Sequence, residues 1–137
     1  MKATRILETC LYVDDLDAAE KFYQDVMGLE FYAKQEGRHV FFRCGTTMFL
    51  LFDPKGTSDP SLPFGGHGSH GPGHAAFEIG EDEIAAWRDY LTSCGVPIDS
   101  ETDWPSGGHS LYFRDPAGNI LEVATRSTWV WPNDQAK

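Results

Sequence analysis

Apolar and polar positions follow two periodicities in different segments of the chain. Some segments alternate every second residue, as in a strand, and others repeat with the period of a helix. Residues 6–13, ILETCLYV, carry the β-branched and aromatic side chains typical of a strand. Residues 14–28 repeat apolar side chains at helical spacing, begin with a capping residue, Asp14 or Asp15, and end at Gly28. The pattern therefore predicts a strand followed by a helix.

The same order of elements is predicted twice. Three more strands are expected within residues 29–53, and a long connection rich in Gly, Pro, Ser and His follows at 53–73. The second series is expected to have strands at 74–79, 96–104, 109–115 and 119–125 and a helix at 81–95. Gly28 and Gly95, which end the two helices, are 67 positions apart. The sequence thus predicts two copies of one βαβββ module, and a site between copies should use equivalent positions of each.

Length and charge restrict the class of protein. A chain of 137 residues has the size of one compact domain, and it contains no apolar run of the roughly 18 residues that a membrane-spanning helix needs. The net charge of −10 argues against nucleic acid and anionic membranes as partners. Three cysteines without a C-x-x-C pair favour a reducing, cytoplasmic location over a disulfide-bonded protein.

One imidazole and two carboxylates stand at positions that suggest chemistry. His74 opens the first strand of the second module, Glu8 occupies the matching place in the first, and Glu122 lies among apolar residues of the last strand. A carboxylate in apolar surroundings needs a partner or a metal ion. Three such ligands on separate strands suit a divalent cation with positions open for substrate. A hydrogen-bonded cluster without metal is the structural alternative.

The Gly-rich stretch 64–80 contains His67, His70 and His74 within eight positions. His67 and His70 are expected to be solvated loop residues, because the glycines around them provide no fixed geometry. His109 is expected in a turn. Of the three clustered histidines, only His74 is predicted to take part in chemistry.

Three segments carry a resemblance to a known family. Residues 11–31 (LYVDDLDAAEKFYQDVMGLEF), 73–79 (GHAAFEI) and 110–123 (SLYFRDPAGNILEV) make the chain similar to the vicinal oxygen chelate (VOC) superfamily. This group includes glyoxalase I, fosfomycin-resistance transferases, methylmalonyl-CoA epimerase, extradiol dioxygenases and bleomycin-resistance proteins. The resemblance implies an α+β fold in which paired βαβββ modules form a cupped mixed sheet. The expected single domain has module one at 5–53, a connection at 53–73, module two at 74–126 and a tail at 127–137.

The resemblance also implies a metal site. Its ligands fall on Glu8, where the family usually has His, and on His74 and Glu122. Leu50 occupies the place of a fourth ligand in glyoxalase-like members, so the pattern resembles the three-ligand members more than glyoxalase I. One divalent ion per site is expected. Two oxygen ligands and one nitrogen ligand favour Mn²⁺, Fe²⁺ or Mg²⁺, with Zn²⁺ and Ni²⁺ as alternatives.

Further pocket residues follow from the resemblance. Ser110 and Tyr112 match an S-x-Y pattern that reaches the substrate in fosfomycin-type members, and Tyr112 is expected to donate a hydrogen bond to a developing oxyanion. Cys10 shares a strand face with Glu8, either lining the pocket or filling the core. Glu8, Glu122 or an unassigned pocket residue would act as the base in a proton transfer.

The predicted function is that of a divalent-metal-dependent enzyme acting on a small oxygenated molecule, as a glyoxalase-like lyase, isomerase, epimerase or transferase. A non-catalytic drug-binding dimer of the bleomycin-resistance type and an extradiol-type dioxygenase are the alternatives. Thr102 stands where a phosphonate-binding Lys would be expected, which argues against fosfomycin as the substrate. The family resemblance implies a homodimer. Trp129 and Trp131 in the tail would either cap an apolar pocket or, the expected role for exposed aromatic side chains, pack on a partner subunit.

Overall fold

The computed structural model describes residues 1–63 and 66–132, so parts of the expected connection and tail, 64–65 and 133–137, lie outside the described residues. The chain divides into two compact units. The first comprises Met1–Gly73 with Pro116–Asn119, and the second comprises His74–Asp115 with the chain from Ile120 onward. Each unit contains one of the two predicted modules, and the short turn 116–119 belongs to the first unit.

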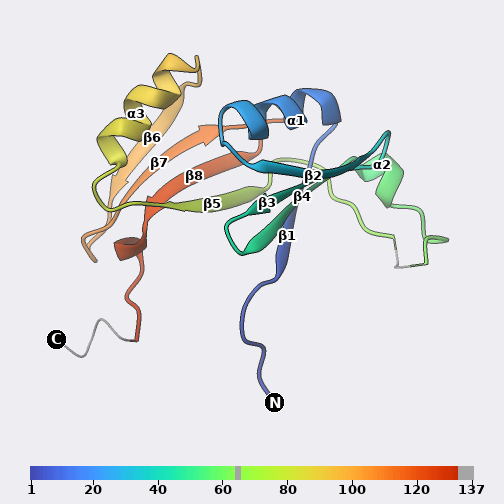
Figure 1. The fold of residues 1–137 in the computed structure, drawn as a ribbon, viewed down its shortest axis with the longest axis horizontal. Helices are drawn as coiled ribbons and strands as arrows, with labels where there is room; N and C mark the ends of the chain where they lie inside the picture. Colours follow the sequence, from blue (N-terminus) through green and yellow to red (C-terminus); the bar gives the residue numbers. More distant parts are fainter. Residues whose placement is uncertain (64–65, 133–137) are drawn as a thin grey trace. The chain divides into compact units, whose positions relative to one another are not determined.

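The first unit is a four-stranded sheet with a helix on one face (Figure 1). Its elements are β1 (Glu8–Tyr12), α1 (Leu16–Asp25), β2 (Glu30–Gln35), β3 (His39–Cys44), β4 (Thr47–Phe52) and α2 (Pro54–Thr57). The strand order is β1-β4-β3-β2, with β1 parallel to β4 and the other neighbours antiparallel. The short helix α2 was not predicted; it forms because the Asp53 carboxylate accepts a hydrogen bond from the Lys55 amide at 2.9 Å.

The core of the first unit lies between α1 and one face of the sheet. Asp15 caps α1 by accepting a hydrogen bond from the Ala18 amide at 3.0 Å, and Gly28 beyond its end has a φ of 66°. Tyr23 of α1 is fully buried, and its ring centroid is 5.1 Å from that of Phe49 on β4. Because side chains alternate along a strand, Cys10 of β1 lies on the other face of this sheet.

The second unit repeats this architecture (Figure 1). Its elements are β5 (His74–Ile79), α3 (Ile84–Ser93), β6 (Ile98–Asp103), β7 (His109–Arg114), β8 (Ile120–Thr125) and the 3-10 turn η1 (Arg126–Thr128). The strand order is β5-β8-β7-β6, with β5 parallel to β8. Leu91 of α3 and Leu111 of β7 are both fully buried in its core. The prediction of paired βαβββ modules is confirmed, although the structure describes two four-stranded sheets and not one continuous sheet.

The strand registers of the two units are equivalent. The first unit pairs Glu8 with Met48 and Cys10 with Leu50, and the second pairs His74 with Ile120 and Ala76 with Glu122. Glu8 therefore corresponds to His74, and Leu50 corresponds to Glu122. The internal repeat expected from the sequence is confirmed at the level of individual residue pairs.

Two further features concern the whole described chain. Among residues 1–63 and 66–132, no helix is both long enough and apolar enough to cross a membrane. Cys10, Cys44 and Cys94 are free thiols.

Candidate metal centre and pocket

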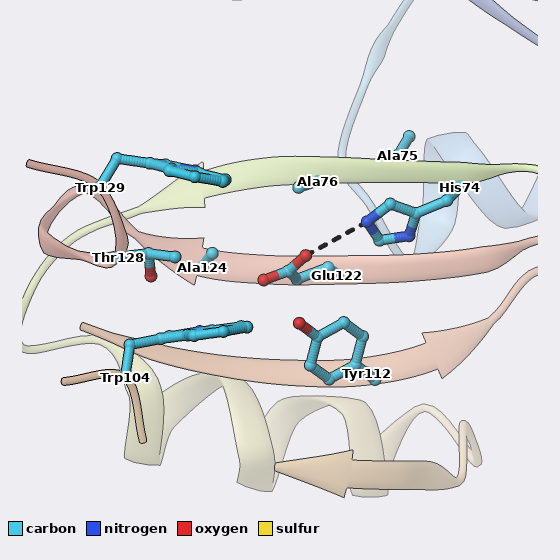
Figure 2. Close-up of a pocket in the computed structure, with 9 residues that line it drawn as sticks. All are labelled: His74, Ala75, Ala76, Trp104, Tyr112, Glu122, Ala124, Thr128 and Trp129. Atoms are coloured by element: carbon cyan, nitrogen blue, oxygen red, sulfur yellow. Dashed lines mark ion pairs between the residues drawn. The ribbon is translucent and has the colours of Figure 1, made fainter. Parts of the chain in front are cut away.

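His74 and Glu122 lie together on one face of the second sheet (Figure 2). Nε2 of His74 is 3.3 Å from Oε2 of Glu122. The two residues lie on adjacent parallel strands, and Ala76, which shares a face with His74, is the register partner of Glu122. The Glu122 side chain is 8% exposed, whereas that of His74 is 50% exposed. The pair is thus anchored in the sheet at one end and open to solvent at the other.

The main chain fixes the orientation of the His74 ring. Nδ1 lies 2.9 Å from the carbonyl oxygen of Ile120. A carbonyl oxygen only accepts, so Nδ1 carries a proton and donates it to Ile120. In the neutral ring, Nε2 then presents its lone pair toward Oε2 of Glu122, which is also an acceptor. Two facing acceptors repel each other, and a metal ion bound between them would relieve this repulsion.

Ser110 of β7 holds the other oxygen of Glu122. The Ser110 hydroxyl is fully buried, donates to Oε1 of Glu122 and accepts a hydrogen bond from Nε1 of Trp104 at 2.8 Å. Because an indole N–H only donates and a hydroxyl has one proton, the chain of hydrogen bonds is directed toward the carboxylate. Ser110 is predicted to contact substrate, and this stays a prediction. Trp104 was missed by sequence analysis.

Tyr112 of β7 lies beside the pair. Its ring and that of His74 are nearly parallel, with an interplanar angle of 25° and centroids 6.3 Å apart. Burial raises the pKa of the Tyr112 phenol, and the neighbouring Glu122 carboxylate raises it further. The phenol therefore keeps its proton near neutral pH and can donate a hydrogen bond, as its predicted role requires.

These side chains line a cavity of about 450 Å³ within the second unit (Figure 2). One end is polar and is formed by His74, Glu122 and Tyr112; the other end is formed by Trp104, Ala124 and Trp129. No Lys or Arg is among the described residues that line it. A cavity of this volume, mostly apolar with a few converging polar groups, is typical of a small-molecule site. The structure therefore places Trp129 at a pocket, the less expected of its two roles.

Glu8 and Cys10 belong to the first unit. Glu8 is exposed, so the expectation of a carboxylate in apolar surroundings is wrong for this residue; it begins β1, an edge strand. Its candidacy as a ligand rests on its correspondence to His74. Cys10 is partly buried, and Leu50, the counterpart of Glu122, is 8% exposed and apolar. Within each unit taken by itself, the described residues hold no group of three His, Cys, Asp or Glu side chains placed to bind a metal ion.

His67 has a defined geometry, contrary to prediction. Its Nδ1 is 2.6 Å from the Tyr12 hydroxyl, and its amide donates to the Thr57 carbonyl at 2.9 Å. Its ring packs edge-on against Phe52, with centroids 4.7 Å apart. The surrounding glycines therefore do not leave this residue without fixed contacts, although it remains exposed. His70 is exposed, as expected.

His109 begins β7, in agreement with the strand predicted at 109–115, so the expectation that it lies in a turn is wrong. Its Nδ1 is 2.6 Å from the Asp103 carboxylate, and its Nε2 is 3.0 Å from that of Glu101. Glu101 also accepts two hydrogen bonds from Arg88 of α3, at 2.6 and 2.8 Å. This network joins α3, β6 and β7 and is not part of the cavity lining.

Known proteins share both the sequence pattern and the fold. The family model of the glyoxalase/bleomycin resistance protein/dioxygenase superfamily matches residues 5–123. A crystal structure of lactoylglutathione lyase from Agrobacterium tumefaciens is similar with a TM-score of 0.91 and 43% identity, over 96% of this chain and 100% of that chain. The lactoylglutathione lyase of Haemophilus influenzae is 29% identical over 131 residues, covering 90% of this chain and 95% of the relative. The metallothiol transferase FosB of Staphylococcus epidermidis is 27% identical over 127 residues, covering 91% of this chain and 84% of the relative. The chain belongs to the glyoxalase/bleomycin resistance protein/dioxygenase superfamily, as its sequence pattern indicated.

Proposed function

We propose that the chain is a divalent-metal-dependent, glyoxalase-like enzyme in which His74 and Glu122 hold the metal ion. The observation that carries this proposal is the 3.3 Å separation of Nε2 and Oε2, with Nδ1 of His74 bonded to the Ile120 carbonyl. Two donor atoms that each lie about 2.1 Å from one cation are about 3.0–3.4 Å apart in octahedral or tetrahedral coordination. The spacing and the direction of the donor atoms therefore fit a shared cation.

Glu8 is the proposed third ligand. It occupies in β1 the register place that His74 occupies in β5. Leu50, the counterpart of Glu122, has no donor atom, so the repeat supplies three ligands and not four. Three protein ligands leave positions for two substrate oxygens. One nitrogen and two carboxylate ligands favour Mn²⁺, Fe²⁺ or Mg²⁺ over Zn²⁺ and Ni²⁺. The proposed assembly is a homodimer.

The proposed reaction moves a proton between adjacent carbon atoms of an oxygenated substrate. A bound divalent ion supplies positive charge that polarises the substrate oxygens. A carboxylate, Glu8 or Glu122, removes the proton from the C–H next to the carbonyl and returns it to the neighbouring carbon. The Tyr112 hydroxyl donates a hydrogen bond to the oxygen on which negative charge develops. Ser110 keeps the Glu122 carboxylate in place throughout.

Relatives indicate which substrates to test first. The Agrobacterium tumefaciens and Haemophilus influenzae proteins are named for lactoylglutathione, a 2-hydroxyacyl thioester. This chain is accordingly proposed to act as a lyase or isomerase on 2-hydroxy or 2-oxo carbonyl compounds. Transfer of a thiol, as in the name of FosB, is the second reaction to test.

The experiment is to incubate the protein, loaded in turn with each of the five ions, with lactoylglutathione in D₂O and to follow the products by mass spectrometry. Wild type should incorporate deuterium next to the carbonyl or release free glutathione with at least one ion. Glu122→Gln should lose at least about 100-fold in rate, because both a metal ligand and a candidate base are removed. Glu30→Gln, which changes a carboxylate paired with Arg43 on β2 and β3, should keep the rate. If wild type neither incorporates deuterium nor releases glutathione with any of the five ions, the proposed proton transfer on this substrate is contradicted.

A further inference from the structure

Two tryptophan side chains form an end of the cavity to which the proposed reaction gives no role. Trp104 follows β6 and Trp129 follows η1. Figure 2 shows both indole rings nearly edge-on, on either side of Ala124, with their faces turned toward one another across β8. The indole pair and Ala124 together form a slot with aromatic walls and a small apolar floor, which we call the indole slot.

The indole N–H of Trp104 is already engaged, and the Thr128 hydroxyl, which also lines this cavity, is buried without a hydrogen-bond partner among the described residues. Nε1 of Trp104 donates its proton to the Ser110 hydroxyl at 2.8 Å, and that hydroxyl in turn donates to Glu122. No Lys or Arg is among the described lining residues. The slot therefore offers a carboxylate or phosphonate group no cation, and it offers an uncharged ring two π faces.

The main chain that carries the second wall of the slot, Trp129, is held without a ligand. The Trp129 amide donates to the Arg126 carbonyl at 3.2 Å, and the same carbonyl accepts a hydrogen bond from Nε1 of Trp131 at 3.0 Å. The Arg126 guanidinium lies over the Trp131 ring, 4.2 Å from its centroid. Trp129 itself is 69% exposed. These contacts hold the main chain of Trp129, and its largely exposed indole gains from burial against an apolar ligand.

We propose that the indole slot binds a flat aromatic substituent of the substrate, while the two-oxygen group of the same molecule lies at His74 and Glu122. This inference rests on the proposed function and names its substrate class: 2-oxo or 2-hydroxy carbonyl compounds that carry an aryl group. The cavity volume of about 450 Å³ is in the range of pockets that enclose molecules of this size.

The slot is tested first without metal. The four tryptophans each give one indole N–H signal in a ¹⁵N–¹H NMR spectrum, which single Trp→Phe substitutions assign. Benzamide added to the metal-free protein should shift the signals of Trp104 and Trp129 until they saturate. The signal of Trp87, which lies on α3 outside this cavity, should stay in place, and acetamide should shift none of them. No shift at Trp104 and Trp129, or equal shifts of all four signals, would overturn the proposal.

A second measurement connects the slot to the metal centre. Benzohydroxamate, cyclohexanecarbohydroxamate and acetohydroxamate present the same pair of adjacent oxygens but differ in the attached group. Calorimetry on the metal-loaded protein should show benzohydroxamate binding about tenfold more tightly than the other two, because only its ring is flat and aromatic. Trp129→Ala should abolish this preference and leave the affinity for acetohydroxamate unchanged. Tyr90→Ala, which removes an exposed aromatic side chain on α3, should keep the preference for benzohydroxamate.

The outcomes separate the slot from the metal site. Equal affinities of the three hydroxamates for wild type, or a preference that survives in Trp129→Ala, would overturn the indole slot and leave the metal centre standing. Failure of all three hydroxamates to bind the metal-loaded protein would contradict the proposed function. The benzamide titration alone would then test whether the indole slot binds an aromatic ring.

Discussion

Nε2 of His74 and Oε2 of Glu122 are 3.3 Å apart, near the start of β5 and β8, the two adjacent parallel strands in the described part of the second unit. The imidazole is oriented by a main-chain carbonyl and the carboxylate by a buried hydroxyl. Each donor is thus fixed by a separate hydrogen bond that does not involve the other. This is the arrangement expected of ligands whose positions are set before a cation binds.

Ser110→Ala should weaken metal binding. The substitution removes the hydrogen bond to Oε1 of Glu122 and leaves Nε1 of Trp104 without its acceptor. We expect a loss of about 10- to 100-fold in metal affinity and of about 1–3 kcal/mol in the free energy of unfolding. Competition with a fluorescent chelator measures the metal affinity, and unfolding in urea measures the free energy of unfolding. Ser93→Ala, whose hydroxyl bonds only within α3, is the matched control, and an equal loss of affinity in both variants would contradict the orienting role.

Asn119→Ala should destabilise the first unit. Asn119 is 1% exposed, donates to the Tyr12 carbonyl at 3.0 Å and accepts from the Gly73 amide at 2.7 Å. Its loss removes the hydrogen bonds to two partly buried main-chain groups, which should lower the free energy of unfolding by about 1–3 kcal/mol. Gln24→Ala, an exposed amide on α1, should change it by less than about 0.5 kcal/mol. If the two variants unfold at similar urea concentrations, the hydrogen bonds of Asn119 contribute little to the stability of the fold.

His67→Ala should loosen the connection between α2 and β5. The Tyr12 hydroxyl and the Phe52 ring are the contacts that hold this histidine. Without them, limited proteolysis within residues 58–73 should become faster by about three- to tenfold, since local opening is easier. His70→Ala changes an exposed histidine of the same segment and should leave cleavage unchanged. Equal cleavage of His67→Ala and wild type would refute the anchoring role.

The His109 network should make stability depend on pH. Burial lowers the pKa of His109, but the hydrogen bonds to Asp103 and Glu101 outweigh it, so the pKa is raised above its usual value near 6.5. The charged imidazole therefore stabilises the fold fully below about pH 6.5, and this stabilisation is lost as pH rises through the raised pKa. In Asp103→Asn, NMR titration should find a lower His109 pKa and thermal unfolding a weaker fall of Tm above pH 6.5. An unchanged pKa in that variant would contradict this account.

The stabilisation from Glu101 depends on pH in the opposite direction, because it is lost as pH falls. The hydrogen bonds from Arg88, and then those from His109, lower the pKa of the Glu101 carboxyl to about 2. Its stabilising contribution is present above its unfolded pKa, about 4.5, and is lost as pH falls through the folded value. The two groups together should make the network most stabilising between about pH 4.5 and 6.5.

Local patterns predicted the order of the elements, because strand alternation, helical spacing and the helix-ending glycines Gly28 and Gly95 each act within a few residues. The same patterns placed His74 and Glu122 on strands of one module. Strand pairing brought the two together as expected for parallel neighbours. The sequence was therefore informative wherever one strand face or one helix turn determined the position of a side chain.

Contacts between distant segments were not predictable in the same way. Trp104 reaches Ser110 because Thr102 and Ser110 are register partners across the β6–β7 hairpin, and the register is set by a turn whose geometry the residues do not specify. The contact of His67 with Tyr12 joins residues 55 positions apart. The exposure of Glu8 depends on the place of β1 at a sheet edge, which alternation along one strand does not reveal.

Metal stoichiometry is the most direct test of the central claim that His74 and Glu122 hold a divalent ion. Wild type, His74→Ala, Glu122→Gln and the control His70→Ala are purified side by side without chelator, supplied with Mn²⁺, Fe²⁺, Mg²⁺, Ni²⁺ or Zn²⁺, and examined by elemental analysis. We predict roughly one ion per chain in wild type and in His70→Ala, and loss of the ion in the other two variants. Wild type that holds no ion under any of these conditions, or a His74→Ala variant that keeps it, would contradict the account.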